Sequence, residues 1–554
     1  MLETLDGFIR GSPAALLFAV LGLGSLVGRA NVRGIELGTV SGVLFVGLAF
    51  GHFGYEFSSA AQTIGFVLFI FSVGLQAGPS FFSVLRQDGL RYLALALVVG
   101  STGFLLALGF AKALGLAPGA AAGLLAGGLT SSPTLAAAQD AVRGGKVPIP
   151  EGYDADQLLT NISTGYAITY IFGLIGLILI IRFLPRILGI DLAAEAAKLE
   201  AGRKGGVEDR VFGLADIRAR AYRVTVDEYI GKTIREMHAL FPGKGTIEKL
   251  RRRGEMIEPS LETMLERDDE VCVVGRLDAL MSAPVGPEIA DHELLDVHIE
   301  SCRVVALRSK VKELTFTPEQ GVREYGCFLS RIQRLGVDVP FGETISFQAG
   351  DVLHVTGPAA RLKALGDTIG HVEGAAEQTD LTTFAIGIAL GLFVGTLSVT
   401  IGGLSIGLGS AGGLLTAGLL IGYLRALHPR FGRVPGAARW IFMELGLLIF
   451  MAGVGLRAGS GILETLAETG PKMFLAGLVV TAVPVLVGYL FGSKFLRINP
   501  VLLLGAITGS MTSGASLSIV TREANSSIPA LGYTGAYAFA NIFLTIAGGV
   551  ILLL

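Results

Sequence analysis

Two long apolar blocks flank a polar stretch in the middle of this chain. Each block holds five apolar runs long enough to cross a membrane as a helix. They lie at 13–28, 35–51, 60–77, 92–116 and 160–182 in the first block, and at 381–399, 405–424, 440–456, 473–493 and 532–554 in the second. The pattern predicts a polytopic α-helical membrane protein with five transmembrane helices in each block.

A sixth apolar run in each block differs in composition. Residues 120–139 read AAAGLLAGGLTSSPTLAAAQ and residues 501–520 read VLLLGAITGSMTSGASLSIV, so Thr, Ser and Gly stand where a lipid-facing helix has Leu or Ile. Unwound backbone at membrane depth is tolerated only where protein buries it or where it lines a cavity. Close helix packing explains one such run alone, but two at matching positions favour a pair of re-entrant hairpins that bind a ligand.

Basic clusters in the loops orient these segments. They are Arg29 with Arg33, Arg86 with Arg91, Arg182 with Arg186, Arg425 with Arg430, Arg433 and Arg439, and Lys494 with Arg497. With both hairpins re-entrant, every cluster falls on the cytoplasmic side, as the positive-inside rule requires. The polar insert is then cytoplasmic and both termini lie outside. Twelve full crossings would instead place the basic edge of the insert outside.

Charge is concentrated in the insert. Residues 187–380 hold 25 basic and 33 acidic side chains, 58 of the 90 in the chain, although only 16% of all 554 residues are charged and 51% are hydrophobic. This composition excludes a secreted disulfide scaffold, a disordered protein and a simple cytosolic enzyme. A net charge of −2 argues against binding nucleic acid. Without a nucleophile–base pair, a metal-ligand set or a P-loop, we expect no catalysis, metal or cofactor.

The two blocks repeat each other. GFVLFIFSVGLQAG (65–78) recurs as GLLIFMAGVGLRAG (446–459), and Thr130-Ser131 recurs as Thr512-Ser513. Five spans is an odd number, so the two repeats must have opposite orientations. Inverted repeats with broken segments at matching positions are typical of secondary transporters. The two hairpins would enter from opposite faces and meet near the midplane.

The candidate substrate site consists of hydroxyls and bare backbone, because neither hairpin contains Asp, Glu, Lys or Arg. Helix N-termini with free N–H groups suit carboxylates without a buried arginine. Polar residues of the last spans, and the repeat partners Gln76 and Arg457, could also line the pathway. The alternatives are that the tyrosines only pack and that Arg457 is a snorkelling interfacial residue. The predicted residues are Thr130, Ser131, Ser132, Pro133, Thr134, Thr512, Ser513, Gly514, Ala515, Ser516, Tyr166, Tyr537, Asn541, Gln76 and Arg457.

The insert mixes short β-like runs with polar helices. RDDEVCVVGR (267–276) and QAGDVLHVTGP (348–358) each place acidic residues before a strand and a glycine. This resembles the ligand-binding TrkA-C (RCK-C) module in a tandem pair, which implies a small-molecule regulator. Arg251-Arg252-Arg253 reads as a solvated basic face, with a nucleotide or anionic-lipid site as the alternative. The three unclustered cysteines, Cys272, Cys302 and Cys327, indicate a reducing compartment.

The whole arrangement resembles the aspartate:alanine exchanger family of bacterial secondary transporters. GGLTSSPTLAAA (127–138), GSMTSGASLSIV (509–520), the two repeated glycine-containing segments and the tandem insert carry the resemblance. It implies exchange of small carboxylate-bearing substrates, such as aspartate for alanine, or of dicarboxylates, in the bacterial inner membrane. The second hairpin departs from the first, with Gly514-Ala515 where Ser132-Pro133 stands, which leaves the substrate open.

We expect four regions: membrane repeat 1 (1–186), a linker and first TrkA-C-like domain (187–290), a second such domain (291–380) and membrane repeat 2 (381–554). Glycine-rich first spans without ligand groups favour a homodimeric scaffold, against which a core bearing both hairpins would move as an elevator. Rocking of two halves is the alternative. An ion channel or cation transporter gated by the insert, and a membrane sensor, are the competing functions.

Overall fold

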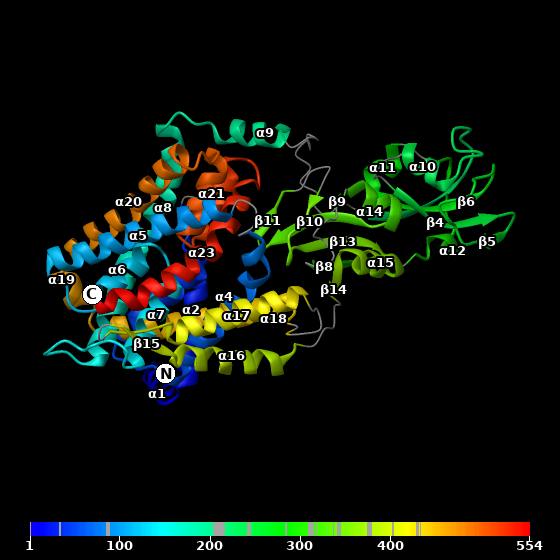
Figure 1. Ribbon diagram of the computed structural model, residues 1–554. Helices are drawn as coiled ribbons and strands as arrows, with labels where there is room; N and C mark the ends of the chain where they lie inside the picture. Colours follow the sequence, from blue (N-terminus) through cyan, green and yellow to red (C-terminus); the bar gives the residue numbers. More distant parts are fainter. Residues whose placement is uncertain are drawn as a thin grey trace. The chain divides into compact units, whose positions relative to one another are not determined.

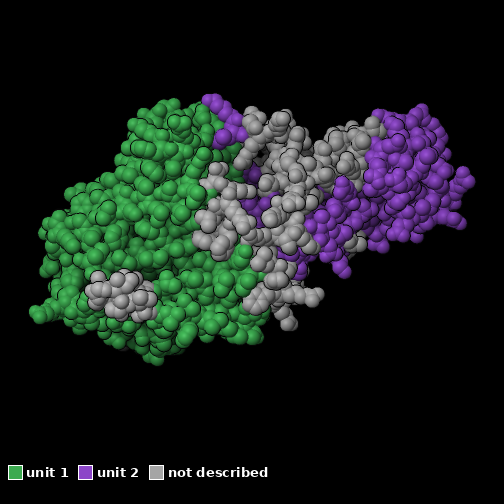
Figure 2. Space-filling view, viewed as in Figure 1, with its two compact units in different colours: residues 1–196, 378–554 green, residues 197–377 purple. Residues whose placement is uncertain are grey.

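The computed structural model describes residues 2–554, except 33–34, 85–88, 203–216, 241–244, 283–284, 298, 308–314, 317, 336, 341–344, 374–378, 402–403, 428–431 and 433. Of the predicted basic clusters, Arg33, Arg86, Arg430 and Arg433 lie outside the described residues. The chain forms two compact units, residues 1–196 with 378–554 and residues 197–377, which Figure 2 colours separately. We call them the membrane unit and the insert unit.

The membrane unit is helical, and its main helices occur twice in the same order, with α1, α9 and α19 as additions to the repeat. The first series is α1 (Leu2–Gly11), α2 (Pro13–Gly28), α3 (Thr39–His52), α4 (Ser59–Val84), α5 (Gly89–Leu114), α6 (Ala120–Gly128), α7 (Ser132–Arg143), α8 (Ala155–Ile187) and α9 (Leu192–Gly202). The second is α16 (Leu381–Thr396), α17 (Gly409–Leu427), α18 (Gly436–Gly459), α19 (Ile462–Glu468), α20 (Gly470–Lys494), α21 (Pro500–Ser510), α22 (Gly514–Glu523), α23 (Pro529–Val550) and the short η1 (Ile551–Leu553). Each predicted span thus contains a helix.

Not every predicted span is long enough to cross a membrane. Among the described residues six helices are, by length and composition: α4, α5, α8, α18, α20 and the helix from Pro529 to Leu553. The helices α2, α3 and α16 are shorter. Strand pairs follow α2 and α16, namely β1 (Asn31–Val32) with β2 (Ile35–Glu36) and β15 (Ser398–Ile401) with β16 (Leu404–Gly407). The predicted runs 35–51, 381–399 and 405–424 were therefore too long, because apolar strand residues extended them.

The helices of the membrane unit pack in two groups, which can be followed in Figure 1. The scaffold group is α2, α3, α4, α16, α17 and α18; the core group is α5, α6, α7, α8, α20, α21, α22 and α23. Within the scaffold group, α3 packs on α18 and α4 packs on α17, so each half binds the other. These crossings use glycine on both helices: Gly51 faces the Leu456 backbone, and Gly78 faces the backbone of Leu419. Neither position has room for a Cβ atom, which is the usual basis of close helix packing in membranes.

The insert unit contains two lobes with one topology. In the first lobe the strands are β3 (Ile217–Arg223), β4 (Gly245–Arg252), β5 (Glu255–Ile257), β6 (Glu270–Arg276) and β7 (Glu288–Ile289), in the order β5-β4-β6-β3-β7. In the second they are β8 (Ile299–Ala306), β10 (Phe328–Arg334), β11 (Val337–Val339), β13 (Val352–Pro358) and β14 (Gly370–Glu373), in the order β11-β10-β13-β8-β14. Substituting each strand by its counterpart makes the two orders identical, so the tandem arrangement is visible in the topology.

Helices and two further strands complete the lobes. The helices are α10 (Ile234–Leu240), α11 (Leu277–Ser282), α12 (His292–Leu295), α14 (Pro318–Tyr325) and α15 (Ala359–Ile369), and β9 (Thr315–Phe316) pairs with β12 (Ile345–Ser346). An irregularity in the strand register recurs too, between Ile247 and Lys249 in β4 and between Leu329 and Arg331 in β10. The repeat therefore extends to local backbone detail.

An arginine–aspartate pair closes the same turn in both lobes. Arg252 binds Asp269 through two bonds of 2.9 and 2.7 Å, and Arg334 binds Asp351 through two of 2.8 and 2.7 Å. Both aspartates are 1% exposed, and such two-point pairs fix geometry as well as charge. Since a buried carboxylate needs its partner, these pairs are structural.

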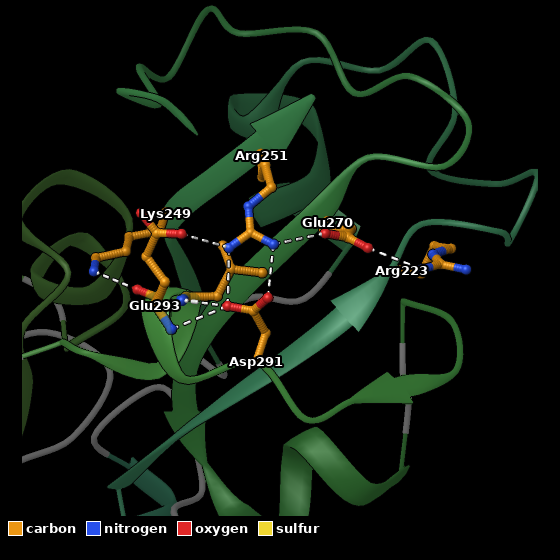
Figure 3. Close-up of polar contacts among 7 residues, drawn as sticks. Arg223, Lys249, Arg251, Glu270, Asp291 and Glu293 are labelled. Atoms are coloured by element: carbon orange, nitrogen blue, oxygen red, sulfur yellow. Dashed lines mark hydrogen bonds and ion pairs between the residues drawn. The ribbon is translucent and has the colours of Figure 1, made fainter. Parts of the chain in front are cut away.

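The predicted basic face at Arg251-Arg252-Arg253 is therefore wrong for its first two residues. Figure 3 shows Arg251 enclosed by acidic groups: it binds Asp291 at 2.6 Å, Glu293 at 3.0 Å and Glu270 at 3.2 Å. Only Arg253, whose side chain is 87% exposed, is solvated as expected. The guanidinium of Arg251 holds the pKa of Asp291 well below its usual range. Both terminal nitrogens of Arg251 are thus engaged by acidic side chains, which disfavours an anionic ligand there.

Candidate functional site

Two broken helix pairs form the centre of the core group. The first broken pair is α6 with α7 and the second is α21 with α22, matching the two runs that the sequence singled out. Thr130 and Thr512 break them, with φ of 52° and 54°. Positive φ is rare for a β-branched residue and costs about 1–3 kcal/mol. Strain of this size at the same point of both repeats indicates a functional requirement.

The helix that follows each break starts in the same way. Ser131 caps α7, where its hydroxyl accepts the Thr134 N–H at 3.4 Å and the Thr134 hydroxyl at 2.7 Å. Ser513 caps α22 and lies 3.3 Å from the Ser516 nitrogen and 2.9 Å from its hydroxyl oxygen. Such caps satisfy one of the free N–H groups of a first turn. Two of the four hydroxyls are therefore caps and the other two bind them, and all four residues are buried.

The two breaks contact each other directly. The Thr130 hydroxyl donates to the Met511 carbonyl at 2.7 Å, and the Thr512 hydroxyl donates to the Thr130 carbonyl at 3.2 Å. Each strained threonine thus binds the backbone of the other repeat. Through these bonds the N-termini of α7 and α22 lie at one place, although 381 residues separate Thr130 from Met511 in sequence.

The contacts of α8 show where along this long helix the two breaks cross. Both ends of the first broken pair reach one part of α8, since Asn161 binds the Pro118 carbonyl at 3.0 Å and Gln139 binds Ser163 at 2.8 Å. The second broken pair ends near the other end of α8, where Glu523 lies 3.5 Å from Arg182. Residues 162 and 182 of one helix are about 30 Å apart. Gly173, which contacts Thr130, lies about halfway between them.

Tyrosines line the crossing. Tyr166 is fully buried, its hydroxyl has no hydrogen-bond partner among the described residues, and its ring centroid lies 5.0 Å from that of Tyr170. On α23, Tyr533 stacks on Tyr537 with centroids 5.1 Å apart. Asn541 donates to the Tyr537 carbonyl at 2.8 Å. The predicted residues Tyr166, Tyr537 and Asn541 are therefore all engaged inside the core group.

The second broken pair is the more open of the two. Gly514, Ala515 and Ser518 are exposed, whereas the residues of α7 after Ser132 are buried as far as Gln139. No acceptor among the described residues binds the N–H groups of Gly514 and Ala515. Pro133 removes one such donor from α7. The first turn of α22 therefore has two free N–H donors, one more than the corresponding positions of α7, where Pro133 has none.

Two predicted site residues lie in the scaffold group instead. Arg457 binds Asp156 in the first turn of α8 at 2.8 Å. Asp156 precedes Tyr166 by ten residues, which corresponds to about 15 Å along the helix. Gln76 belongs to α4, between two glycines that pack on α17. The structure does not bring either residue to the crossing through any contact that it describes.

Sequence reasoning missed several residues of this region. Tyr533 is one, since its hydroxyl lies 3.9 Å from the position that a Cβ of Gly514 would take; the spacing of four from Tyr537 was the available signal. Gln62 and Gln139 are others, and their amides join at 3.1 Å across 77 residues. Nothing local in the sequence indicates that contact. Among the described residues no group of His, Cys, Asp and Glu could hold a metal ion.

The two helices are broken at the level of the midpoint of α8, a helix long enough to cross a membrane, and free N–H groups lie at the break. These features are typical of membrane transporters. The family model described as a predicted permease membrane region, of the aspartate–alanine exchanger type, matches residues 16–186 and again residues 383–553. The chain belongs to this family. One model matching twice also shows that the two membrane halves are homologous. No solved structure matches the chain.

Proposed function

We propose that this permease is a secondary transporter that exchanges small carboxylate-bearing substrates, such as aspartate against alanine, or dicarboxylates. The crossing of the two strained breaks, Thr130 and Thr512, is the observation that supports this most directly. It places two helix N-termini together without a charged side chain. Partial positive charge and free N–H groups favour a carboxylate there.

The binding groups that we propose are those left free after capping. They are the N–H groups of Gly514 and Ala515, with the hydroxyls of Ser132 and Tyr533 beside them. Ser131, Thr134, Ser513 and Ser516 act by holding the two helix N-termini in place. Residues 120–139 and 501–520, which include both breaks, contain no Asp or Glu, and this disfavours a cation as the main ligand.

We propose that the two halves are inverted repeats and that both broken pairs are re-entrant hairpins. The level of each pair along α8 supports this, because the first pair starts and ends near Asn161 while the second ends near Arg182. The separation of about 30 Å equals the hydrocarbon thickness of a membrane. The insert and the basic loops are then cytoplasmic, and both termini are outside.

The division into scaffold and core groups supports an elevator-like movement of the core. Glycine-to-glycine packing makes the scaffold group close-fitting, as a static support would be. We further propose that two scaffolds form a homodimer in a bacterial inner membrane. The two lobes of the insert, of TrkA-C type, would bind a small-molecule regulator.

Counterflow with purified protein in liposomes tests the proposal. Liposomes loaded with aspartate, alanine, succinate or malate should each be scored for uptake of the same labelled compounds. Saturable exchange of at least one carboxylate is expected. Exchange confined to neutral sugars or inorganic cations would contradict the substrate class.

The Gly514→Trp variant tests the location of the site. Gly514 is exposed, and the nearest atom to a new Cβ is the Tyr533 hydroxyl at 3.9 Å, so a side chain can begin there without overlap. It should abolish exchange by covering the free N–H groups. The matched control is Gly109→Trp on α5, where nothing lies within 4 Å of a new Cβ. Full exchange by a folded Gly514→Trp protein would place the site elsewhere.

A further inference from the structure

We propose that Arg143 and Arg457 form a second anion site, separate from the crossing, between the end of the first broken pair and the scaffold group. Arg143 is the last residue of α7, and Arg457 lies in the last turn of α18. The ligand is a small anion, either an inorganic one or a substrate carboxylate. Only the carboxylate case rests on the proposed function.

Buried amides, and no carboxylate, bind the guanidinium of Arg143. It donates to the Gln62 side-chain oxygen at 2.6 Å and to that of Gln139 at 3.4 Å. Gln62 also donates to Gln139, which donates to Ser163 at 2.8 Å. Gln62, Gln139 and Ser163 are at most 1% exposed. The chain therefore fixes the position of this cation precisely without neutralising it.

Two nearby acidic groups, Asp140 and Asp156, attract Arg143 electrostatically but form no ion pair with it. Asp140 accepts the Ser410 N–H at 2.9 Å at the start of α17. Asp156 pairs with Arg457, and its side chain is 83% exposed. Among the described residues no carboxylate forms an ion pair with Arg143. A partly buried charge without a counter-ion is costly, so the arrangement favours one from solution.

Arg457 adds a second, converging donor. Contacts of Gln62 bring Arg457 near Arg143, and the like charges of the two guanidinium groups then repel each other. Gln62 joins them, since it binds Arg143 and packs against Gly453, one turn before Arg457 on α18. The Arg457 Nε–H is buried and has no acceptor. Each cation suits the C-terminus of its own helix, but that does not explain why two lie together with an unused donor.

The experiment is thermal unfolding of the full chain in lipid nanodiscs. Chloride and succinate are titrated separately against a bulky sulfonate as the reference anion. The wild type should gain several degrees in Tm with at least one of them, because a ligand of the folded state stabilises it. Lys112→Gln is the matched control, since Lys112 is an exposed cation at the end of α5. Its response should equal that of the wild type.

Two variants make the test specific. Arg143→Gln should lose the anion response. Gln62→Glu should raise Tm without added anion and also lose the response, because it builds a carboxylate at 2.6 Å from Arg143. The second variant keeps the test decisive if the first does not fold. An unchanged response in Gln62→Glu, or no response of the wild type to either anion, would overturn the site.

The same titration in Gly514→Trp separates this site from the crossing. A succinate response that persists there and vanishes on adding Gln62→Glu assigns the Arg143 site to a carboxylate. A response to chloride alone assigns it to an inorganic anion. A succinate response lost in Gly514→Trp, with none to chloride, would place all anion binding at the crossing and overturn the proposal. Failure of counterflow alone would contradict only the proposed function.

Discussion

The two broken pairs are alike at their breaks and different at their far ends. Thr130 and Thr512 differ by 2° in φ, and both following helices begin with a serine cap. At the far ends, the first broken pair is fastened to the scaffold group: Asp140 accepts from Ser410 of α17, and Lys146 donates to the Gly395 carbonyl of α16 at 2.6 Å.

The second broken pair is instead fastened inside the core group. Glu523 at the end of α22 pairs with Arg182 and Arg186 of α8, at 3.5 and 3.4 Å. The residues of α22 on its open side, Gly514, Ala515 and Ser518, are exposed. Repeated local sequence therefore determines the break, whereas residues that differ between the repeats determine which broken pair is covered. The crossing is therefore less covered on the side of α22 than on the side of α7.

The largest loss of stability is expected when a packed glycine is replaced, and it should be the same for both broken pairs. A Cβ at Gly127 would overlap the Thr169 hydroxyl, and one at Gly509 would overlap the Tyr533 carbonyl. Valine at either position should cost well above the 1–3 kcal/mol of ordinary overpacking, because backbone must move. We expect loss of monodisperse protein in size-exclusion chromatography for both variants. Gly109→Val, with open space at its Cβ, should remain folded. Survival of one of the two would show that the pairs are not equally packed.

Cysteine labelling should separate the pairs. Ser518 of α22 is exposed, and its repeat partner Ala136 of α7 is 1% exposed. A water-soluble maleimide should therefore react with Ser518→Cys about 100-fold faster than with Ala136→Cys, since the latter needs local opening. Equal rates would contradict an open α22; a slow reaction at both would mean that lipid or protein covers it.

The native thiols contribute little background to this measurement. Burial raises the pKa of Cys272 and Cys327 to about 12 and that of Cys302 to about 11. The protonated thiol is unreactive. Labelling at pH 8 therefore leaves them almost entirely protonated, and their reaction should increase only as the pH rises towards 11. The same measurement on the unsubstituted chain provides the control.

Removing single charges should destabilise the first pair more than the second. Asp140→Asn removes a negative charge from the N-terminus of α17 and should cost about 1–2 kcal/mol. Glu523→Gln breaks two partly exposed ion pairs and should cost at most about 1 kcal/mol. Thermal unfolding at matched pH and salt measures both. A larger loss of stability in Glu523→Gln than in Asp140→Asn would mean that the second broken pair is held more strongly than the first.

The smallest difference is expected at the caps. Ser131→Ala and Ser513→Ala each remove one cap and should each cost about 1 kcal/mol. Their difference should be close to zero, because the two caps have nearly the same geometry. Unfolding of the two variants side by side checks this. A clear inequality would show that the surroundings contribute differently at the two breaks.

The sequence by itself determined where the helices lie and where they break. Each of the ten predicted spans contains a helix, and six helices of the described residues are long and apolar enough to cross a membrane, because transfer from water depends on composition along one segment. The Thr-Ser repeats at 130 and 512 located both breaks, and the family resemblance was confirmed by the match to the permease model. These features are local, so a single segment contains all the information needed to predict them.

Only the tertiary structure decided which segments meet. The bond from Thr130 to Met511, the packing of α3 on α18 and the amide contact from Gln62 to Gln139 each join distant parts of the chain. The charge triplet at Arg251 was likewise misread, because its acidic partners lie up to 42 residues away. The sequence does not indicate whether an arginine or a glutamine donates its hydrogen bonds to water or to a buried partner. Only the packed chain distinguishes these two cases.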